Sequence, residues 1–402
     1  MAKIEIRSVT KVFGEHPSAA ISLLRKGKGK ADILRKTGCA LGVNKVSLDV
    51  NEGELVVLMG LSGSGKSTLL RCVNRLIEPN RGSVFIDGED ILRLSSKELR
   101  EVRQKKFGMV FQNFALFPHR TVLQNVEFGL EVMGAGQTER RDAAMRTLET
   151  VGLKNWVDKY PAQLSGGMQQ RVGLARALAL DPDILLMDEA FSALDPLIRR
   201  EMQHELARLQ EEMHKTILFV SHDLDEAIAI GDRIALMKDG AIVQTGSPEE
   251  ILTAPADEYV SRFVADADVS RVLTAGTVMK LSEAVAVLGV DGPRTALRKM
   301  RHNGIAYLFV TDRSQRLHGL VTVEHVSDLL MSGGRDLESI MSTEIKTVDL
   351  DTPASELIPL MADLPYPLAV TDAKGRFAGV IIRGTLLGAL AECANPEPAT
   401  AG

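Results

Sequence analysis

The segment Gly60-Leu-Ser-Gly-Ser-Gly-Lys-Ser67 constrains the fold of this chain more than any other, because it fits G-x-x-x-x-G-K-[ST]. An apolar strand, Leu55–Met59, precedes it, and we expect a helix from Thr68 to Leu76 after it. Glycines in such a loop let successive backbone N–H groups surround a phosphate at a helix N-terminus. A glycine-rich turn that binds nothing is the alternative, which the strand–loop–helix order disfavours. The segment predicts a phosphate-binding loop in an α/β domain, with Lys66 facing phosphates and Ser67 facing Mg²⁺.

The rest of the first 265 residues alternates strands and helices with glycine-rich turns, which is typical of an α/β domain. The clearest strands are continuously apolar, as expected when helices cover both faces of a parallel sheet. These strands are Leu55–Met59, Phe107–Phe111, Ile184–Met187 and Thr216–Val220.

Two acids follow the strand Ile184–Met187 directly. Ligands of such sheets bind beyond the carboxyl ends of the strands, so Asp188 is placed to hold Mg²⁺ and Glu189 to polarise an attacking water. A solvated strand end is the alternative, and it leaves two adjacent acids after four apolar residues without a purpose.

The segment Leu164-Ser-Gly-Gly-Met-Gln-Gln-Arg171 predicts a second anion site, because Ser165 and the glycines open a helix that runs through Leu178. A simple helix cap is the alternative. The segment resembles the signature sequence of ATP-binding cassette (ABC) proteins, in which this cradle acts in trans and two subunits enclose two ATP molecules.

Further motifs follow in the order that this family shows. Gln112 resembles the glutamine loop, Ser192-Ala-Leu-Asp195 the loop at the dimer interface, and His222 the switch histidine. Phe13 matches the aromatic residue that stacks on adenine, although an ordinary core position is its alternative. The resemblance implies that ATP is bound by Phe13, Gly60, Leu61, Ser62, Gly63, Ser64, Gly65, Lys66, Ser67 and Thr68. It implies catalysis by Glu189, His222, Lys66 and Gln112, and Mg²⁺ binding by Ser67, Gln112 and Asp188. It also implies contacts across a homodimer by Ser165, Gly166, Gly167, Gln169 and Asp195.

Two features go beyond the cassette. Residues 15–41 form a basic insertion with six Lys or Arg against two acids, and we expect two short helices broken at Gly27 and Gly29. An anionic membrane surface is one hypothesis for this segment, and a solvated face is the other. The C-terminal region is a weak repeat, in which Ala306–Asp312 and Tyr366–Asp372 each begin a strand–turn–strand–helix unit too small to fold alone.

Together these features resemble the ATP-binding subunit of glycine betaine/proline (quaternary amine) importers with tandem cystathionine-β-synthase-type (CBS) domains. The resemblance implies a P-loop NTPase cassette, with a mixed sheet and a helical subdomain, followed by an α+β CBS pair. We predict an ABC domain at 1–265, a linker at 266–276, CBS domains at 277–335 and 336–394, and a tail at 395–402. Choline, carnitine or another amino-acid-like solute is the alternative substrate.

The CBS pair departs from the nucleotide-binding pattern G-x-x-[ST]-x-x-[DN]. The first copy, Gly319–His325, carries histidine in place of the acid, and the second, Gly379–Thr385, lacks both the hydroxyl residue and the acid. This difference favours sensing of ionic strength, or a structural role, over tight nucleotide binding.

Composition excludes other classes of protein. The formal net charge of −5 disfavours a nucleic-acid partner, and three scattered cysteines fit a reducing compartment. No apolar run approaches the roughly 20 residues that span a bilayer. We therefore expect a peripheral protein on the cytoplasmic face of the bacterial inner membrane, bound to two permease subunits and served indirectly by a periplasmic or lipid-anchored solute-binding protein. A soluble cassette ATPase acting on DNA or ribosomes, and a CBS sensor with an inactive cassette, are the rival classes.

Overall fold

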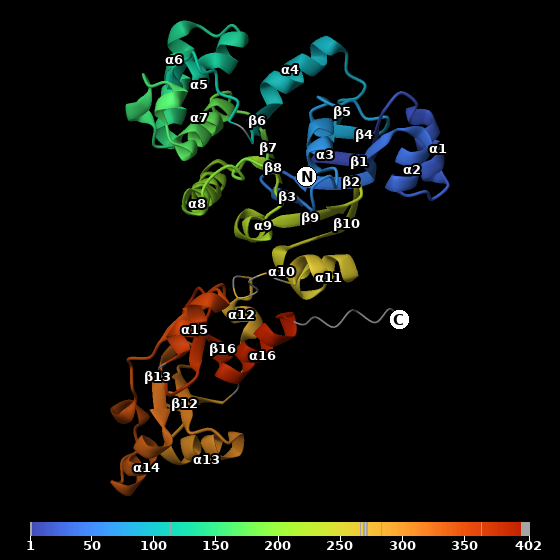
Figure 1. The fold of residues 1–402 in the computed structure, drawn as a ribbon. Coiled ribbons are helices and arrows are strands. Elements are labelled where there is room, and N and C mark those ends of the chain that lie inside the picture. The colour runs from blue at the N-terminus through green and yellow to red at the C-terminus, as the bar shows by residue number, and fades with distance from the viewer. Residues whose placement is uncertain are drawn as a thin grey trace. The chain divides into compact units, whose positions relative to one another are not determined.

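The computed structural model describes residues 2–112, 114–265, 267, 270, 272–282, 284–362 and 364–394, with the backbone alone for 391–394. The chain forms two compact units, one running to Val264 and the other beginning at Ala265 (Figure 1). The predicted tail and residues 266, 268, 269 and 271 of the predicted linker lie outside the described residues. In the part of the chain that is described, no helix is both long and apolar enough to cross a membrane.

The first unit contains a six-stranded sheet in the order β10-β9-β3-β8-β7-β6. All neighbours are parallel except β10 and β9. All residues of β3, β7 and β8 are buried, which agrees with their apolar sequences. The bounds are β3 Leu55–Met59, β6 Phe107–Phe111, β7 Ile184–Asp188, β8 Thr216–Val220, β9 Arg233–Lys238 and β10 Ala241–Gly246, so the four predicted strands are confirmed.

A second sheet of this unit is antiparallel, in the order β2-β1-β4-β5. Its strands are β1 Ala2–Phe13, β2 Ala40–Asn51, β4 Arg81–Ile86 and β5 Glu89–Asp90. Apolar residues of both sheets, with those of the helix after β3, form one buried core. That core holds the loop after β3 on a rigid base.

The helices of the first unit fall into two groups. Helices α5, α6 and α7 pack together, and the others flank the sheets (Figure 1). The bounds are α3 Lys66–Val73, α4 Ser96–Lys106, α5 Val122–Val132, α6 Gln137–Thr150, α7 Gly166–Leu178, α8 Pro196–Met213, α9 Leu224–Ile230, α10 Pro248–Thr253 and α11 Glu258–Val264, with single 3₁₀ turns at Lys154–Trp156 and Pro161–Gln163. The prediction for α3 was wrong at both ends, because the helix starts at Lys66 and stops before Arg75, whose φ is +55°.

The insertion between β1 and β2 forms the two predicted helices, α1 Pro17–Arg25 and α2 Lys30–Thr37. Gly38 ends α2 in the left-handed conformation, with φ +67°, that glycine adopts without a Cβ clash. The helices bury a small apolar cluster against the facing ends of both strands, formed by Val12, Ala20, Ile21, Ile33, Cys39 and Leu41. The insertion is therefore an ordered part of this unit.

The second unit contains two copies of the same motif, which confirms the internal repeat. Each copy has a three-stranded sheet in which the first two strands are parallel and the last two antiparallel. The strands are β11 Val285–Val287, β12 Tyr307–Thr311 and β13 Leu317–Thr322, and then β14 Thr347–Asp349, β15 Leu368–Thr371 and β16 Phe377–Ile381. The helices are α12 Ala275–Val278, α13 Pro293–Asn303, α14 Val323–Met331, α15 Ala354–Ala362 and α16 Arg383–Ala394, with a 3₁₀ turn at Leu337–Ile340.

The two repeats pack on each other, as their small size predicts. Phe309, Leu320 and Ala369 form a buried cluster that draws on both copies, and the rings of Phe309 and Phe377 lie 5.3 Å apart. The chain also crosses between them, because Leu273 and Ala275 are buried in the core of the second repeat. The pair is one unit with a shared core.

Candidate active site

The loop after β3 is pressed against neighbouring backbone, so it accepts only glycine at two positions. Gly60 has φ +140° and Gly65 has φ +106°. A Cβ atom at Gly60 would lie 2.2 Å from the carbonyl oxygen of Met237, and one at Gly65 would lie 2.2 Å from that of Gly42. The glycines of the motif therefore fix a single loop shape at the N-terminus of α3.

Lys66 is buried at the base of this loop. Its ammonium donates to the carbonyl oxygens of Gly60 at 2.7 Å and Leu61 at 3.2 Å. Burial lowers the pKa of Lys66, and the charges of Glu189 and Asp188 oppose that shift. The hydroxyl of Ser64 is buried without a hydrogen-bond partner. A cation in a glycine cradle with an unsatisfied hydroxyl fits a bound phosphate chain.

Three parallel strands bring Gln112, Glu189 and His222 together at their carboxyl ends. The Glu189 carboxylate lies 3.4 Å from Nδ1 of His222 and accepts from Nε2 of Gln112 at 3.3 Å. Glu189 also has φ +48°, an uncommon value for a residue other than glycine. Its backbone N–H donates to the carbonyl of Val220, which holds this turn to the next strand. An acid held in this way against a histidine is placed to act on a proton.

Asp188, one residue earlier, is buried and accepts a hydrogen bond from Arg71 at 3.1 Å. Asp188, the Ser67 hydroxyl and the Gln112 amide are oxygen donors of the kind that Mg²⁺ binds. Among the described residues, no group of three or more His, Cys, Asp or Glu could hold a metal.

Phe13, at the end of β1, lies beside the loop with 40% of its surface exposed. A Cβ atom at Gly42 would lie 2.8 Å from the Phe13 ring and 3.1 Å from the Thr68 side chain, so these three residues are neighbours. Nζ of Lys11 lies 5.1 Å from the ring centroid. An exposed ring next to the phosphate cradle is suited to stack on a base.

The turn at Ser165 lies on the helical group and has an exposed start. Ser165 caps α7, and its hydroxyl accepts from the N–H of Met168 at 3.3 Å. Gly167 packs tightly, because a Cβ there would lie 2.4 Å from Ile198. The Gln169 side chain donates to the backbone of its own subunit, at the carbonyl oxygens of Pro161 and Leu164.

Asp195 caps α8, and its carboxylate accepts from the N–H groups of Leu197 and Ile198. Within the described residues, no hydrogen bond joins the segments 165–169 or 195 to the loop 60–68. The structure thus brings Lys66, Asp188, Glu189, Gln112 and His222 to one sheet edge, and the Ser165 turn packs against Leu194 and Ile198, in the segment after Glu189.

Two contacts at this edge involve a partner to which the sequence assigns no role. Arg71 pairs with Asp188 across 117 positions, and the Ser192 hydroxyl accepts from Gln112 at 3.2 Å. The sequence places Arg71 on the helix after the loop and offers no sign of its partner. Ser192 begins the motif Ser192–Asp195, in which the sequence assigns a role to Asp195 alone.

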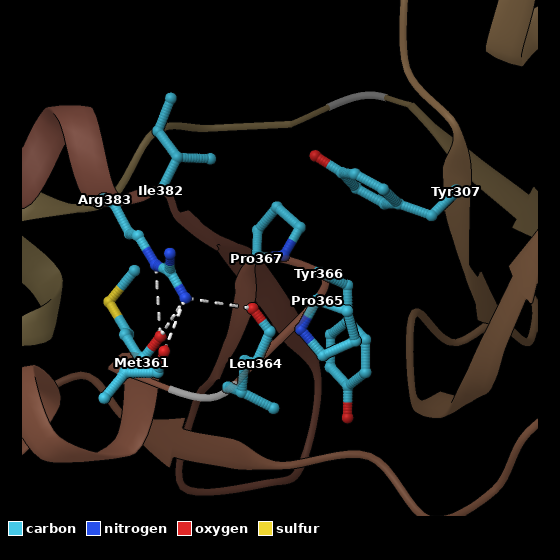
Figure 2. A pocket seen from close by; sticks show the side chains of 9 residues that line it. Tyr307, Met361, Leu364, Pro365, Tyr366, Pro367, Ile382 and Arg383 are labelled. Atoms are coloured by element: carbon cyan, nitrogen blue, oxygen red, sulfur yellow. Dashed lines mark hydrogen bonds between the residues drawn. The ribbon is translucent and has the colours of Figure 1, made fainter.

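The second unit contains a cavity of about 520 Å³ between Tyr307 of the first repeat and residues of the second. Figure 2 shows the Arg383 guanidinium turned to backbone oxygens, where it donates to the carbonyls of Met361, Ala362 and Leu364. The described lining contains no carboxylate to accept ribose hydroxyls. Its members are Tyr307, Met361, Ala362, Leu364, Pro365, Tyr366, Pro367, Ile382 and Arg383.

Comparison with known proteins agrees with both units. The ABC transporter family model matches residues 43–192, and the CBS domain model matches residues 278–332 and 337–392. The solved dimeric structure of the ATP-binding cassette MJ0796 in a post-hydrolysis state with ADP and Pi is 35% identical. It superposes with a TM-score of 0.51 and covers 61% of this chain and 98% of that chain.

Curated relatives match nearly the whole chain. The glycine betaine/carnitine transport ATP-binding protein GbuA of Listeria monocytogenes is 54% identical over 97% of this chain and 98% of its own length. The glycine betaine transport ATP-binding protein OpuAA of Bacillus subtilis is 52% identical, over 97% of this chain and 92% of its own length. The glycine betaine/proline betaine transport system ATP-binding protein ProV of Escherichia coli is 49% identical over 96% of this chain and 97% of its own length. With this coverage, a cassette fold and a tandem CBS unit, the chain belongs to the family of ABC transporter ATP-binding proteins related to the glycine betaine transport subunits.

Proposed function

We propose that this chain hydrolyses ATP to energise uptake of glycine betaine or a closely related quaternary amine. The observation that carries the proposal is the convergence of Lys66, Glu189 and His222 at one sheet edge, in a chain 54% identical to a glycine betaine/carnitine subunit over nearly its full length. Three relatives that cover almost the whole chain have glycine betaine in their names. Choline, carnitine or another amino-acid-like solute is the alternative.

In the proposed mechanism the loop at 60–68 binds the phosphates of ATP, and Phe13 stacks on the adenine. Glu189 acts as the general base that takes a proton from the attacking water, and His222 orients this carboxylate from 3.4 Å. Lys66 offsets negative charge on the phosphates from its buried position. Mg²⁺, held by Ser67, Gln112 and Asp188, would supply Lewis-acid neutralisation of the phosphate charge.

Two copies of the chain form the working pair in this proposal. The turn Ser165–Gly167 of one copy, exposed at Ser165 and Gly166, faces the γ-phosphate held by the other with its helix N-terminus, and Gln169 and Asp195 lie at the same interface. The pair docks under two permease subunits at the cytoplasmic face of the bacterial inner membrane and contacts no nucleic acid. A periplasmic or lipid-anchored solute-binding protein delivers the solute.

The proposed division of labour follows the two units. Residues 1–265 form the ATP-binding domain, and 277–335 and 336–394 form the CBS pair that regulates it after a linker at 266–276. In the CBS pair the segments Gly319–His325 and Gly379–Thr385 depart from the nucleotide-binding pattern, and Arg383 is already engaged by three carbonyls. These features support regulation by ionic strength over regulation by a tightly bound nucleotide.

Transport of labelled glycine betaine, choline and proline by cells with the whole transport system tests the proposal. Strains carry the wild-type chain, the Glu189→Gln chain, or no chain. We expect glycine betaine uptake with the wild type alone. Uptake of glycine betaine that persists without the chain, or that continues unchanged with Glu189→Gln, would refute the proposal. Preferential uptake of choline would favour the alternative substrate.

A further inference from the structure

The basic insertion between β1 and β2 lies beside the nucleotide loop. Its internal core holds it in place, because Ile33 is fully buried and Cys39 packs within reach of Gly14. A Cβ atom at Gly14 would lie 2.7 Å from the Cys39 sulfur, which shows how closely the two ends of the insertion approach each other. The segment therefore has a fixed position rather than a free, solvated one.

Both ends of the insertion adjoin the candidate ATP site. It leaves β1 just after Phe13, the exposed ring beside the loop, and it returns just before Gly42. The carbonyl oxygen of Gly42 contacts Gly65 closely enough to exclude a Cβ atom. Residues 15–41 thus connect the expected adenine contact to the backbone that supports the phosphate loop.

Between these ends, Lys30 contacts the loop itself. Its ammonium donates to the carbonyl oxygen of Gly63 at 2.8 Å, from the first residue of α2. Lys30 is half-buried, whereas Lys26 and Lys28 of the same segment are exposed. Asp32, the acid on this helix, pairs with Arg35 at 2.6 Å.

This contact holds one peptide of the loop at both of its polar atoms. The Gly63 carbonyl accepts from Lys30, and the N–H of the following residue, Ser64, donates to the carbonyl of Leu61 at 3.1 Å. Gly63 is exposed and has φ +76°, and a Cβ atom there would meet no described atom within 4 Å. An ammonium has three donors, so Lys30 retains two for an anion while it holds the loop.

We propose that Lys30 is a positioning residue for ATP, through which the insertion fixes the phosphate loop and adds positive charge beside it. The inference rests on the proposed ATPase function and adds to it a role for residues 15–41. It implies that Lys30 strengthens ATP binding and leaves the chemical step, carried by Glu189, almost unaffected.

The test uses the full chain assembled with its membrane subunits in proteoliposomes. Steady-state ATPase kinetics compare the wild type with Lys30→Met, Lys30→Arg and Lys28→Met. Lys30→Met removes the positive charge and the hydrogen-bond donor of the side chain, whereas Lys30→Arg keeps both. Lys28→Met removes the same charge from an exposed position of the same segment. Equilibrium binding of a fluorescent ATP analogue to the full chain and its thermal midpoint are measured for each variant.

We expect Lys30→Met to raise KM for ATP about three- to tenfold, with kcat within about twofold of the wild type. Lys30→Arg restores most of the affinity, and Lys28→Met matches the wild type. An unchanged KM in Lys30→Met overturns the inference. So does an equal rise in Lys28→Met, because that would be a general effect of charge. A lowered thermal midpoint with kcat reduced and KM unchanged would show a merely structural role and also overturns it. A wild type that binds no ATP would instead refute the proposed function.

Discussion

Replacement of Gly65 by alanine separates steric fit from backbone strain in the phosphate loop. The new Cβ atom would lie 2.2 Å from the carbonyl oxygen of Gly42 and 3.3 Å from its carbonyl carbon. Gly63 is the matched control, since it also has positive φ, +76° against +106°, but a Cβ there meets nothing within 4 Å. Both changes add one methyl group, and only one of them collides with the protein.

The expected magnitudes follow from these distances. Left-handed backbone costs an alanine roughly 1–2 kcal/mol, so Gly63→Ala should weaken ATP binding or turnover by about 5- to 30-fold at most. Gly65→Ala carries a similar strain and must also move the loop by about 1 Å to relieve the contact. A displacement of about 1 Å in a catalytic site costs on the order of 100-fold in rate. Gly65→Ala should therefore lose at least about ten times more activity than Gly63→Ala.

The assay is ATPase activity of the transporter assembled with each variant, alongside equilibrium binding of a fluorescent ATP analogue. Thermal midpoints show whether the cassette remains folded. Equal losses in the two variants would refute the steric reasoning, because they would mean that the Gly42 backbone yields to the added methyl group.

Three other changes test separate parts of the molecule. Glu189→Gln should lower turnover by at least about 100-fold while ATP binding persists, so that size-exclusion chromatography with ATP shows a closed pair; normal turnover would contradict its role as base. Phe309→Ala should destabilise the CBS unit by about 3–5 kcal/mol in denaturant titrations. Leu281→Ala, at a side chain that is 84% exposed, should have little effect. Similar losses of stability in the two variants would contradict the shared core. Burial raises the pKa of Glu226 above 4.5, so the folded chain holds its proton more tightly and loses stability as pH rises through the raised value. The side chain of Glu226→Gln stays neutral at every pH, so the thermal midpoint of the variant minus that of the wild type should be larger at pH 7 than at pH 4. An equal difference in thermal midpoint at the two pH values would contradict this account.

Much of the fold could be predicted because local patterns and buried apolar runs determined it. The strand Thr216–Val220 is apolar at every position but the first and is buried throughout, and its neighbours follow the same rule. The two repeats were visible because the same strand–turn–strand pattern recurs, with Thr-Asp at the end of each first strand. The end of α3 was missed because Arg75 adopts positive φ, for which its side chain gives no signal.

The residues of the candidate site also fall into those that the sequence predicts and those that it does not. Motif residues such as Lys66 and Glu189 carry a local signature, and the sheet brings them together because their strands, β3 and β7, both run parallel to β8, which lies between them. Contacts that depend on tertiary packing have no such signature. Arg71 reaches Asp188 across 117 positions, and Lys30 reaches Gly63 across 33, in each case from a basic residue that resembles many others in the sequence.

The position of the Ser165 turn has a consequence for how the site works. The first N–H groups of a helix have no partner within it, and the Ser165 hydroxyl accepts only that of Met168, so the start of α7 retains donors and a positive dipole end. Within the described residues the loop at 60–68 makes no hydrogen bond to this turn, and in the proposed mechanism Lys66 faces the phosphates of the ATP held by its own chain. In the proposed pair, where the start of α7 faces the γ-phosphate held by a second copy, each ATP lies between two chains. Each ATP then binds both copies together, so ATP binding by one copy should raise the affinity of its partner, and closure of the pair should depend steeply on ATP concentration.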